Sequence, residues 1–95
     1  MEICEICGRP ADCTHHLIFG FGLRRIADED NITISLCNSC HTTGRTLDRI
    51  HDNPMAEHLS KMVGQERWEK QRIIDGATQD EAREQFIKRY GRSWL

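Results

Sequence analysis

Alternating apolar and hydroxyl side chains mark one short strand in the N-terminal half of the chain. Residues 32–36, Ile-Thr-Ile-Ser-Leu, follow the period-2 pattern that is typical of a half-buried strand. Residues 14–19, Thr-His-His-Leu-Ile-Phe, form a second candidate strand. Residues 20–31 combine two glycines, two arginines and an acidic patch, and this composition predicts a loop between the strands. The pattern therefore predicts a β-hairpin, followed by a short helix over residues 37–44.

The second half of the chain has helical spacing instead. Asn53-Pro54 predicts the start of a helix, with asparagine as N-cap and proline at the first helical position. Gly64 is a candidate position for a bend or break in this helix, and Trp68 is expected to point away from its apolar face. That face is expected to consist of Met55, Ala56, Leu59, Met62 and Val63.

A last helix is predicted near the C-terminal end. Thr78 and Glu81 have the spacing of a capping box, and Gly91 is a natural end point. The stripe formed by Ala82, Phe86 and Tyr90 would face the core. The resulting architecture is a hairpin with helices packed around it.

Composition limits what such a chain can bury. A chain of 95 residues with 38% hydrophobic content fits one small domain with a thin core, and such domains often need a disulfide or metal to hold them. No apolar run reaches the ~20 residues of a membrane span, and no secretory signal is visible. We therefore expect a cytoplasmic protein without membrane contact, in a bacterial host or encoded by a phage. The net charge of -2 neither predicts nor excludes a nucleic-acid partner.

Two Cys-x-x-Cys pairs point to a metal. Cys4 and Cys7 are separated by 29 residues from Cys37 and Cys40, and four thiolates suit tetrahedral zinc. A reducing cytosol and an odd cysteine count argue against disulfides. A redox dithiol is the alternative, but its usual βαβ context is missing. The fifth residue, Cys13, is interpreted as a small buried or free thiol rather than as a spare ligand.

The histidines follow the cysteines closely. His15 and His16 are adjacent, so on a strand they would point to opposite faces and serve two different purposes. His41 directly follows the second cysteine pair, and His51 precedes the Asn53-Pro54 helix start. His58, on the predicted helix, is expected to be a surface or structural residue.

Taken together, these motifs resemble the HNH endonucleases, also called the ββα-metal or His-Me finger group. The resemblance rests on CEIC, THHLI, DNITISLCNSCH and IHDNP, and it covers residues 3–54. Within the group, the motif order looks most like the phage recombination-enhancement type. The resemblance implies a small α+β fold with a zinc-stapled ββα-metal hairpin-helix core. Residues 1–53 would form this catalytic core, and residues 54–95 a helical extension packed on it within a single domain.

The resemblance also implies an activity and its residues. His15, His41 and His51 would bind a catalytic divalent ion, which could be Mg²⁺, Mn²⁺, Ni²⁺ or Zn²⁺. His16 would be the general base that activates water for hydrolysis of DNA phosphodiester bonds by an endonuclease or nickase. Imidazole suits this role because its unperturbed pKa lies near ~6.5. Three imidazole ligands favour a transition metal over magnesium.

Asn31 departs from the family pattern. The family's asparagine usually lies five residues before the second cysteine pair, whereas Asn31 lies six before Cys37 and Ile32 occupies the expected place. A one-residue slip in a strand turns a side chain to the other face unless a bulge compensates. Asn31 is therefore either a catalytic-site residue or only a turn residue after an acidic stretch.

Four arginines are candidates for binding phosphates next to the cut: Arg24, Arg25, Arg45 and Arg49. The alternative is that they are solvated and pair with neighbouring aspartates such as Asp28, Asp30, Asp48 and Asp52. Nothing in the sequence indicates base reading, so we expect little or no sequence preference; a protein partner or self-association could supply targeting. The competing function is a non-catalytic zinc-ribbon-like module for nucleic-acid binding or protein interaction, which would need the four cysteines but not the histidine set.

Overall fold

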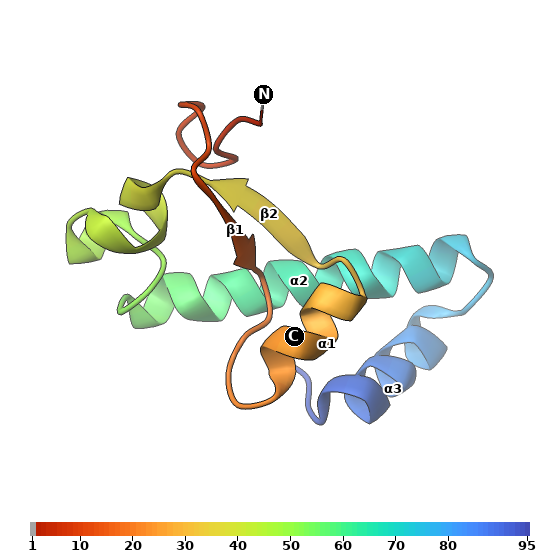
Figure 1. Ribbon diagram of the computed structural model, residues 1–95. Helices are drawn as coiled ribbons and strands as arrows, with labels where there is room; N and C mark the ends of the chain where they lie inside the picture. Colours follow the sequence, from red (N-terminus) through yellow and green to blue (C-terminus); the bar gives the residue numbers. More distant parts are fainter. Residues whose placement is uncertain (1) are drawn as a thin grey trace.

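The computed structural model describes residues 2–95 as a small α+β structure with one two-stranded antiparallel sheet and helices (Figure 1). Strand β1 (Cys13–His16) pairs with β2 (Thr33–Leu36), so that Cys13 lies opposite Leu36 and His16 opposite Thr33. The expected antiparallel pairing of the two strands is confirmed, although β1 ends at His16 rather than at residue 19.

The segment between the strands is a helix and not the loop that its composition predicts. Helix α1 spans Leu23–Glu29 and begins after Gly22, which has a left-handed conformation and provides no side-chain cap. Leu23, Ile26 and Ala27 pack on the core, and their spacing is that of one helical face. The sequence did not predict this helix because glycines and charged residues surround its short apolar face and no capping residue precedes it.

Two short helical turns follow β2. A π-helical turn, η1 (Ser39–Thr43), lies within the range predicted as a short helix and contains Cys40 of the second cysteine pair. A 3-10 turn, η2 (Thr46–Asp48), leads to the segment that contains His51. Together they connect the sheet to the long helix.

Helix α2 (Pro54–Ile74) begins as predicted and runs without a break across the two-stranded sheet (Figure 1). The side chain of Asn53 accepts a hydrogen bond from the backbone N–H of Ala56 at 3.3 Å. Gly64 does not interrupt the helix. A Cβ atom there would lie 2.8 Å from Ile18 and 3.0 Å from Leu17, so glycine permits close contact between α2 and the chain after β1.

The buried face of α2 is not the predicted one. Met55 is 74% exposed and Leu59 is 51% exposed, whereas Trp68 lies in the core. The buried residues of α2 are mostly polar or small: Ser60, Gly64, Gln65, Trp68 and Glu69. Hydrophobic spacing failed here because hydrogen-bond partners elsewhere in the chain compensate the burial of polar side chains.

Helix α3 (Gln79–Tyr90) matches its prediction closely. Thr78 and Glu81 form both hydrogen bonds of a capping box, and Gly91 ends the helix in a left-handed conformation. Phe86 and Tyr90 are buried and stacked, with ring centroids 4.6 Å apart. The C-terminal Trp94 packs on Phe86, which places the end of the chain against the core.

Asp30 joins α1 to the two long helices. Its carboxylate accepts hydrogen bonds from Arg89 at 2.7 Å, Tyr90 at 2.8 Å and the Trp68 indole at 3.0 Å. Burial raises the pKa of Asp30, but these donors outweigh that effect and hold the pKa below its ordinary value. Asp30 is thus a structural carboxylate rather than a partner of the arginines near β1.

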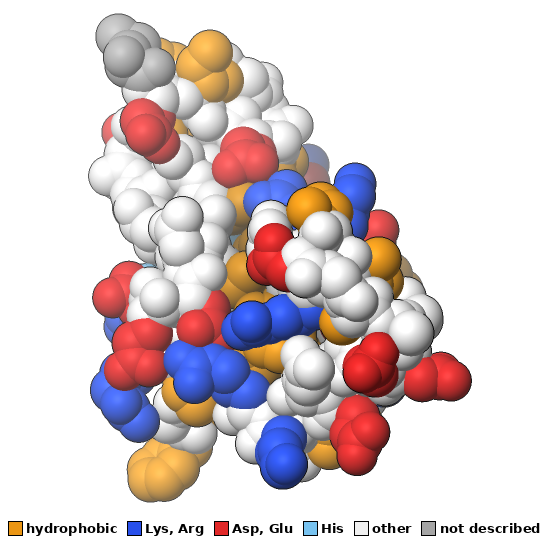
Figure 2. Space-filling model, turned by 90° about the vertical axis from the view of Figure 1, so that its right-hand side faces the viewer, with side chains coloured by type: hydrophobic (Ala, Val, Ile, Leu, Met, Phe, Trp, Pro, Cys, Tyr) orange, Lys and Arg blue, Asp and Glu red, His pale blue; other side chains and the backbone are white. Residues whose placement is uncertain are grey.

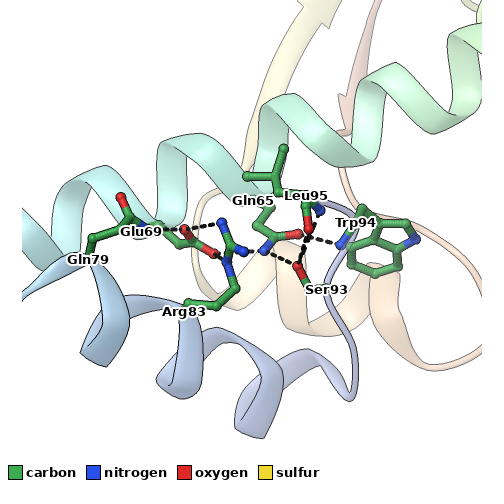
Figure 3. Close-up of polar contacts among 7 residues, drawn as sticks. All are labelled: Gln65, Glu69, Gln79, Arg83, Ser93, Trp94 and Leu95. Atoms are coloured by element: carbon green, nitrogen blue, oxygen red, sulfur yellow. Dashed lines mark hydrogen bonds and ion pairs between the residues drawn. The ribbon is translucent and has the colours of Figure 1, made fainter.

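A second buried carboxylate connects α2 with α3 and the C-terminal segment (Figure 3). Glu69 accepts hydrogen bonds from Arg83 at 2.8 Å, Gln79 at 2.7 Å and Gln65 at 2.7 Å. Gln65 in turn accepts from the backbone N–H of Trp94 at 2.7 Å. These bonds explain why a polar face of α2 is buried.

Surface charges on the face shown in Figure 2 are intermixed, with Lys and Arg side chains beside Asp and Glu. That face therefore presents no continuous basic area. Among residues 2–95, none of the helices has the length and apolar character needed to cross a membrane.

Replacing Glu69 with alanine should lower the free energy of unfolding by about 2–3 kcal/mol, because Arg83 and the amide groups lose their buried acceptor. Burial raises the pKa of Glu69, but its hydrogen-bond donors lower it overall. Below its ordinary pKa of 4.5, the unfolded carboxyl takes up a proton that the folded one resists. The difference between the two proteins should therefore be full above that pH and shrink as pH falls.

Urea denaturation over a pH series measures this effect. The control is Glu66→Ala, an exposed neighbour on α2, which should change stability by less than about 0.5 kcal/mol. Equal stability of the two variants at neutral pH would contradict the structural role of Glu69.

Candidate metal centres

The two cysteine pairs come together as their spacing predicts. Cys4 and Cys7 lie in a tight turn, closed by a hydrogen bond from the Gly8 N–H to the Cys4 carbonyl at 3.0 Å. Cys37 directly follows β2, and Cys40 lies in η1. One sulfur atom from each of the four residues lies within 4.8 Å of the others, and all are free thiols.

The geometry of this cysteine cluster suits tetrahedral zinc. The Cys7 and Cys37 sulfurs are 3.7 Å apart, too far for a disulfide. A Zn–S distance of ~2.3 Å would place tetrahedral sulfurs roughly 3.8 Å apart. Arg9 donates to the Cys7 sulfur at 3.2 Å, and this contact lowers the pKa of the Cys7 thiol.

Ionisation of one thiol in the cluster opposes that of its neighbours. Burial raises the pKa of Cys40 to about 12, and its thiol neighbours add to the effect. Burial also acts on Cys4, but backbone hydrogen bonds from Cys37, Cys7 and Ile6 lower its pKa to about 6. Four thiolates in this space need more positive charge than Arg9 provides, and a divalent cation is the chemical group that supplies it.

A second cluster consists of three histidines from three different segments. His15 lies on β1, His41 in η1, and His51 in the segment before α2. The His51 N–H donates to the His41 carbonyl at 3.2 Å and the Ile50 N–H to the Cys40 carbonyl at 2.9 Å, which holds the two segments side by side. One ring nitrogen from each histidine lies within 4.8 Å of the other two.

The buried His15 ring is fixed by a serine of α2. The Ser60 hydroxyl donates its one proton to the Leu17 carbonyl at 2.8 Å, and its oxygen lies 2.8 Å from His15 Nε2. His15 Nε2 must therefore carry the proton of that contact, which leaves Nδ1 with a free lone pair. Burial, together with positive charge on His41 and His51, lowers the pKa of His15 to about 3, so the ring is neutral.

The other two rings have outer partners as well. His41 Nδ1 lies 3.4 Å from the Cys13 sulfur, and His51 Nδ1 lies 3.6 Å from a Glu57 carboxylate oxygen. In both rings Nε2 is the nitrogen left to coordinate an ion. Burial lowers the pKa of His41, and the nearby charges of His51 and Arg24 act in the same direction. Outer partners of this kind are typical of metal-binding histidines.

His16 belongs to the same cavity but has a different environment. The cavity has a volume of about 250 Å³ and is lined by all four of these histidines, with Thr14, Phe19 and Arg24. His16 Nε2 lies 3.0 Å from Asp28 Oδ1, and Arg24 Nε donates to His16 Nδ1 at 3.3 Å. As expected from their positions on a strand, the adjacent histidines have different partners: His15 faces α2 and His16 faces α1.

The four candidate arginines have separate environments. Arg24 lines the cavity, whereas Arg25 pairs with Glu29 at 3.1 Å and Arg45 with Asp48 at 2.6 Å. Arg49 is a structural residue that donates to the carbonyls of His51 and Gly44 and pairs with Asp52 at 3.0 Å. Of the four, Arg24 therefore has the most direct access to the histidines.

Asn31 is not brought to the histidines. It lies in the turn after α1 with φ of 57°, and it borders a groove with Trp68 and Arg67 of α2. Asparagine tolerates this left-handed conformation better than most residues, which fits a turn role. Asp28, rather than Asn31, contacts the His16 side chain.

Several site residues were not found from the sequence. Ser60 and Glu57 lie on α2, outside the segment 3–54 that contains the recognised motifs. Cys13 was interpreted as a small buried or free thiol. The only sequence signal for them is chemical type, because their histidine partners are distant in the chain or lie in irregular segments. His58 is exposed, as expected for a surface histidine.

Comparisons with protein-family models, with curated proteins and with solved structures found no significant match for this chain. The functional argument therefore depends on the geometry of the two clusters and of the cavity.

The tautomer of His15 can be tested directly. In protein purified without added divalent ions, long-range ¹⁵N–¹H NMR should show His15 protonated at Nε2 and bare at Nδ1, because Ser60 already donates its proton to Leu17. Ser60→Ala should remove this preference, and Ser60→Thr, which keeps the hydroxyl, should retain it. Protonation of His15 at Nδ1 alone in the wild type would contradict the assignment.

Proposed function

We propose that this chain is a metal-dependent endonuclease or nickase of the HNH type that hydrolyses DNA phosphodiester bonds. The observation that carries the proposal is the single cavity lined by His15, His16, His41 and His51, in which three ring nitrogens converge. The fourth, His16, is held apart by Asp28 and Arg24. This division into three ligands and one separate base is what hydrolysis by a metal-bound site requires.

The three converging histidines would hold the catalytic divalent ion. His15 Nδ1, His41 Nε2 and His51 Nε2 are the nitrogens that their outer partners leave free. A bound ion would polarise a phosphate oxygen and stabilise charge on the leaving 3′ oxygen. An all-imidazole set favours Zn²⁺ or Ni²⁺ over Mg²⁺.

His16 would take the proton of the attacking water. Its Nε2–H points to the Asp28 carboxylate, which orients the ring and leaves Nδ1 as the basic nitrogen. Arg24 occupies Nδ1 in the free protein. A substrate phosphate would attract the Arg24 guanidinium and so release Nδ1 for water, which links substrate binding to activation of the base.

The four-cysteine cluster would hold a structural zinc. Its ligands tie the N-terminal turn to the end of β2 and to η1, which carries His41. A two-stranded sheet alone is marginally stable, so a metal that ties the turn before β1 to the segment after β2 would contribute folding free energy directly.

Cys4→Ser should lose the structural zinc and unfold the N-terminal half, because a structural zinc site depends on all its ligands. Metal analysis and circular dichroism measure the two effects. Cys13→Ser is the matched control, since Cys13 lies outside the four-cysteine cluster and should keep one zinc per chain. A Cys4→Ser protein with unchanged zinc content and fold would contradict the structural site.

His16→Ala should reduce the rate of plasmid cleavage by about 10²–10⁴-fold, while fold and metal content stay unchanged, because only the general base is lost. His58→Ala is the control, an exposed histidine outside the cavity that should cleave like the wild type. Equal cleavage by the His16 variant would exclude its role as base. A wild-type protein that cleaves no nucleic acid with Mg²⁺, Mn²⁺, Ni²⁺ or Zn²⁺ would favour the zinc-ribbon-like binding module.

A further inference from the structure

Phe21 is a fully exposed aromatic side chain near the proposed site. Phe21 is 106% exposed, more than any other large hydrophobic residue in the described part of the chain. Single exposed apolar residues are common and need no explanation by themselves. Phe21 differs from the others because of the turn that presents it, the charges next to it and the depression that its neighbour Gly22 lines.

The turn holds Phe21 away from the protein. The Leu23 N–H donates to the Gly20 carbonyl at 3.1 Å, which makes Phe21 and Gly22 the central residues of a β-turn. Gly22 has φ of 76° and ψ of -11°, the values of the third position in a type II turn. The phenyl ring is thus carried outward by an ordered turn.

Two cations follow this turn directly in the chain, and they share a depression with the proposed base. An open depression of about 500 Å³ is lined by His16, Gly22, Arg24, Arg25 and Asp28. Arg25 is 76% exposed, and its partner Glu29 lies on the exposed surface of α1, so the guanidinium is accessible to a ligand. The depression therefore runs from the aromatic turn to the base, with arginines along it.

This combination fits one class of ligand. Phosphates bind arginine guanidinium groups, and an aromatic ring without neighbours offers a flat surface to a nucleic-acid base. A base can reach the ring only when it is not stacked between its own neighbours, as in single-stranded or locally unpaired DNA. A duplex with all its bases stacked would offer only phosphates.

We propose that Phe21, Arg24 and Arg25 form a nucleotide platform, on which an unstacked base lies against Phe21 while its phosphate enters the depression beside His16. The proposal rests on the proposed nuclease function and specifies the form of its substrate. DNA with an unpaired segment should bind better than intact duplex, and the cut should fall next to the unpaired nucleotide.

Binding is best measured in a His16→Ala background, where cleavage does not interfere. Fluorescence anisotropy would compare dye-labelled oligo(dT) with a duplex of equal length. Phe21→Ala should weaken binding of oligo(dT) by about tenfold or more, with a smaller effect on duplex, because stacking on the ring is lost. Phe21→Leu should also bind weakly, since leucine is apolar but has no π-face.

Phe21→Trp provides a gain-of-signal test. It should keep the affinity for oligo(dT), and the new indole should be quenched on binding, whereas Trp68 and Trp94 are buried and should respond little. Ile74→Ala is the control, since Ile74 is exposed at the far end of α2 and outside the depression. Arg25→Ala should reduce the salt dependence of binding instead of the stacking signal.

Binding of oligo(dT) by Phe21→Ala at parental affinity, or equal losses on oligo(dT) and duplex, would overturn the platform. If the wild type cleaves DNA while Phe21→Ala binds and cleaves equally well, this inference fails and the nuclease stands. If no ion supports cleavage by the wild type but oligo(dT) binding depends on Phe21, the nuclease fails and the platform stands.

Discussion

The close contact of α2 with the chain after β1 is the constraint on which much of the structure depends. Gly64 allows the helix to approach Leu17 and Ile18 at a distance that no side chain would permit. One turn earlier, this approach brings Ser60 within hydrogen-bond distance of His15. One turn later, it places Trp68 in the core. A single glycine thus couples the proposed site to the packing of the C-terminal helices.

Features with local causes could be predicted from the sequence. Asn53 and the Thr78–Glu81 pair satisfy backbone groups within their own helix, so both helix starts were found. The four-cysteine cluster could also be predicted, because the Cys-x-x-Cys spacing is typical of a zinc site. The face of α2 could not be predicted, because Gln65 and Glu69 are buried only by virtue of donors from α3 and the C-terminal segment. Helix α1 was missed because no side chain caps it.

The site residues likewise divide into those that could be predicted from the sequence and those that could not. The three histidines of the second cluster lie next to recognisable motifs, so their approximate grouping could be predicted from the sequence. Their outer partners did not, since the contact between His15 and Ser60 joins residues 45 positions apart. The role expected of Asn31 depended on its register relative to β2. Asn31 instead lies in a left-handed conformation in the turn after α1, and α1 brings Asp28 to His16.

The arrangement also shows how so small a chain could prepare the proposed metal site before an ion binds. Each ring of the histidine cluster has one nitrogen next to an outer partner, which leaves the other free. The buried His15 remains neutral, so an ion does not have to displace a proton from it. His16 differs because its partners are an exposed acid and an exposed arginine, which a substrate can rearrange. In the proposed site, His15 is therefore fixed by a buried partner on α2, whereas His16 is held by two exposed side chains of α1.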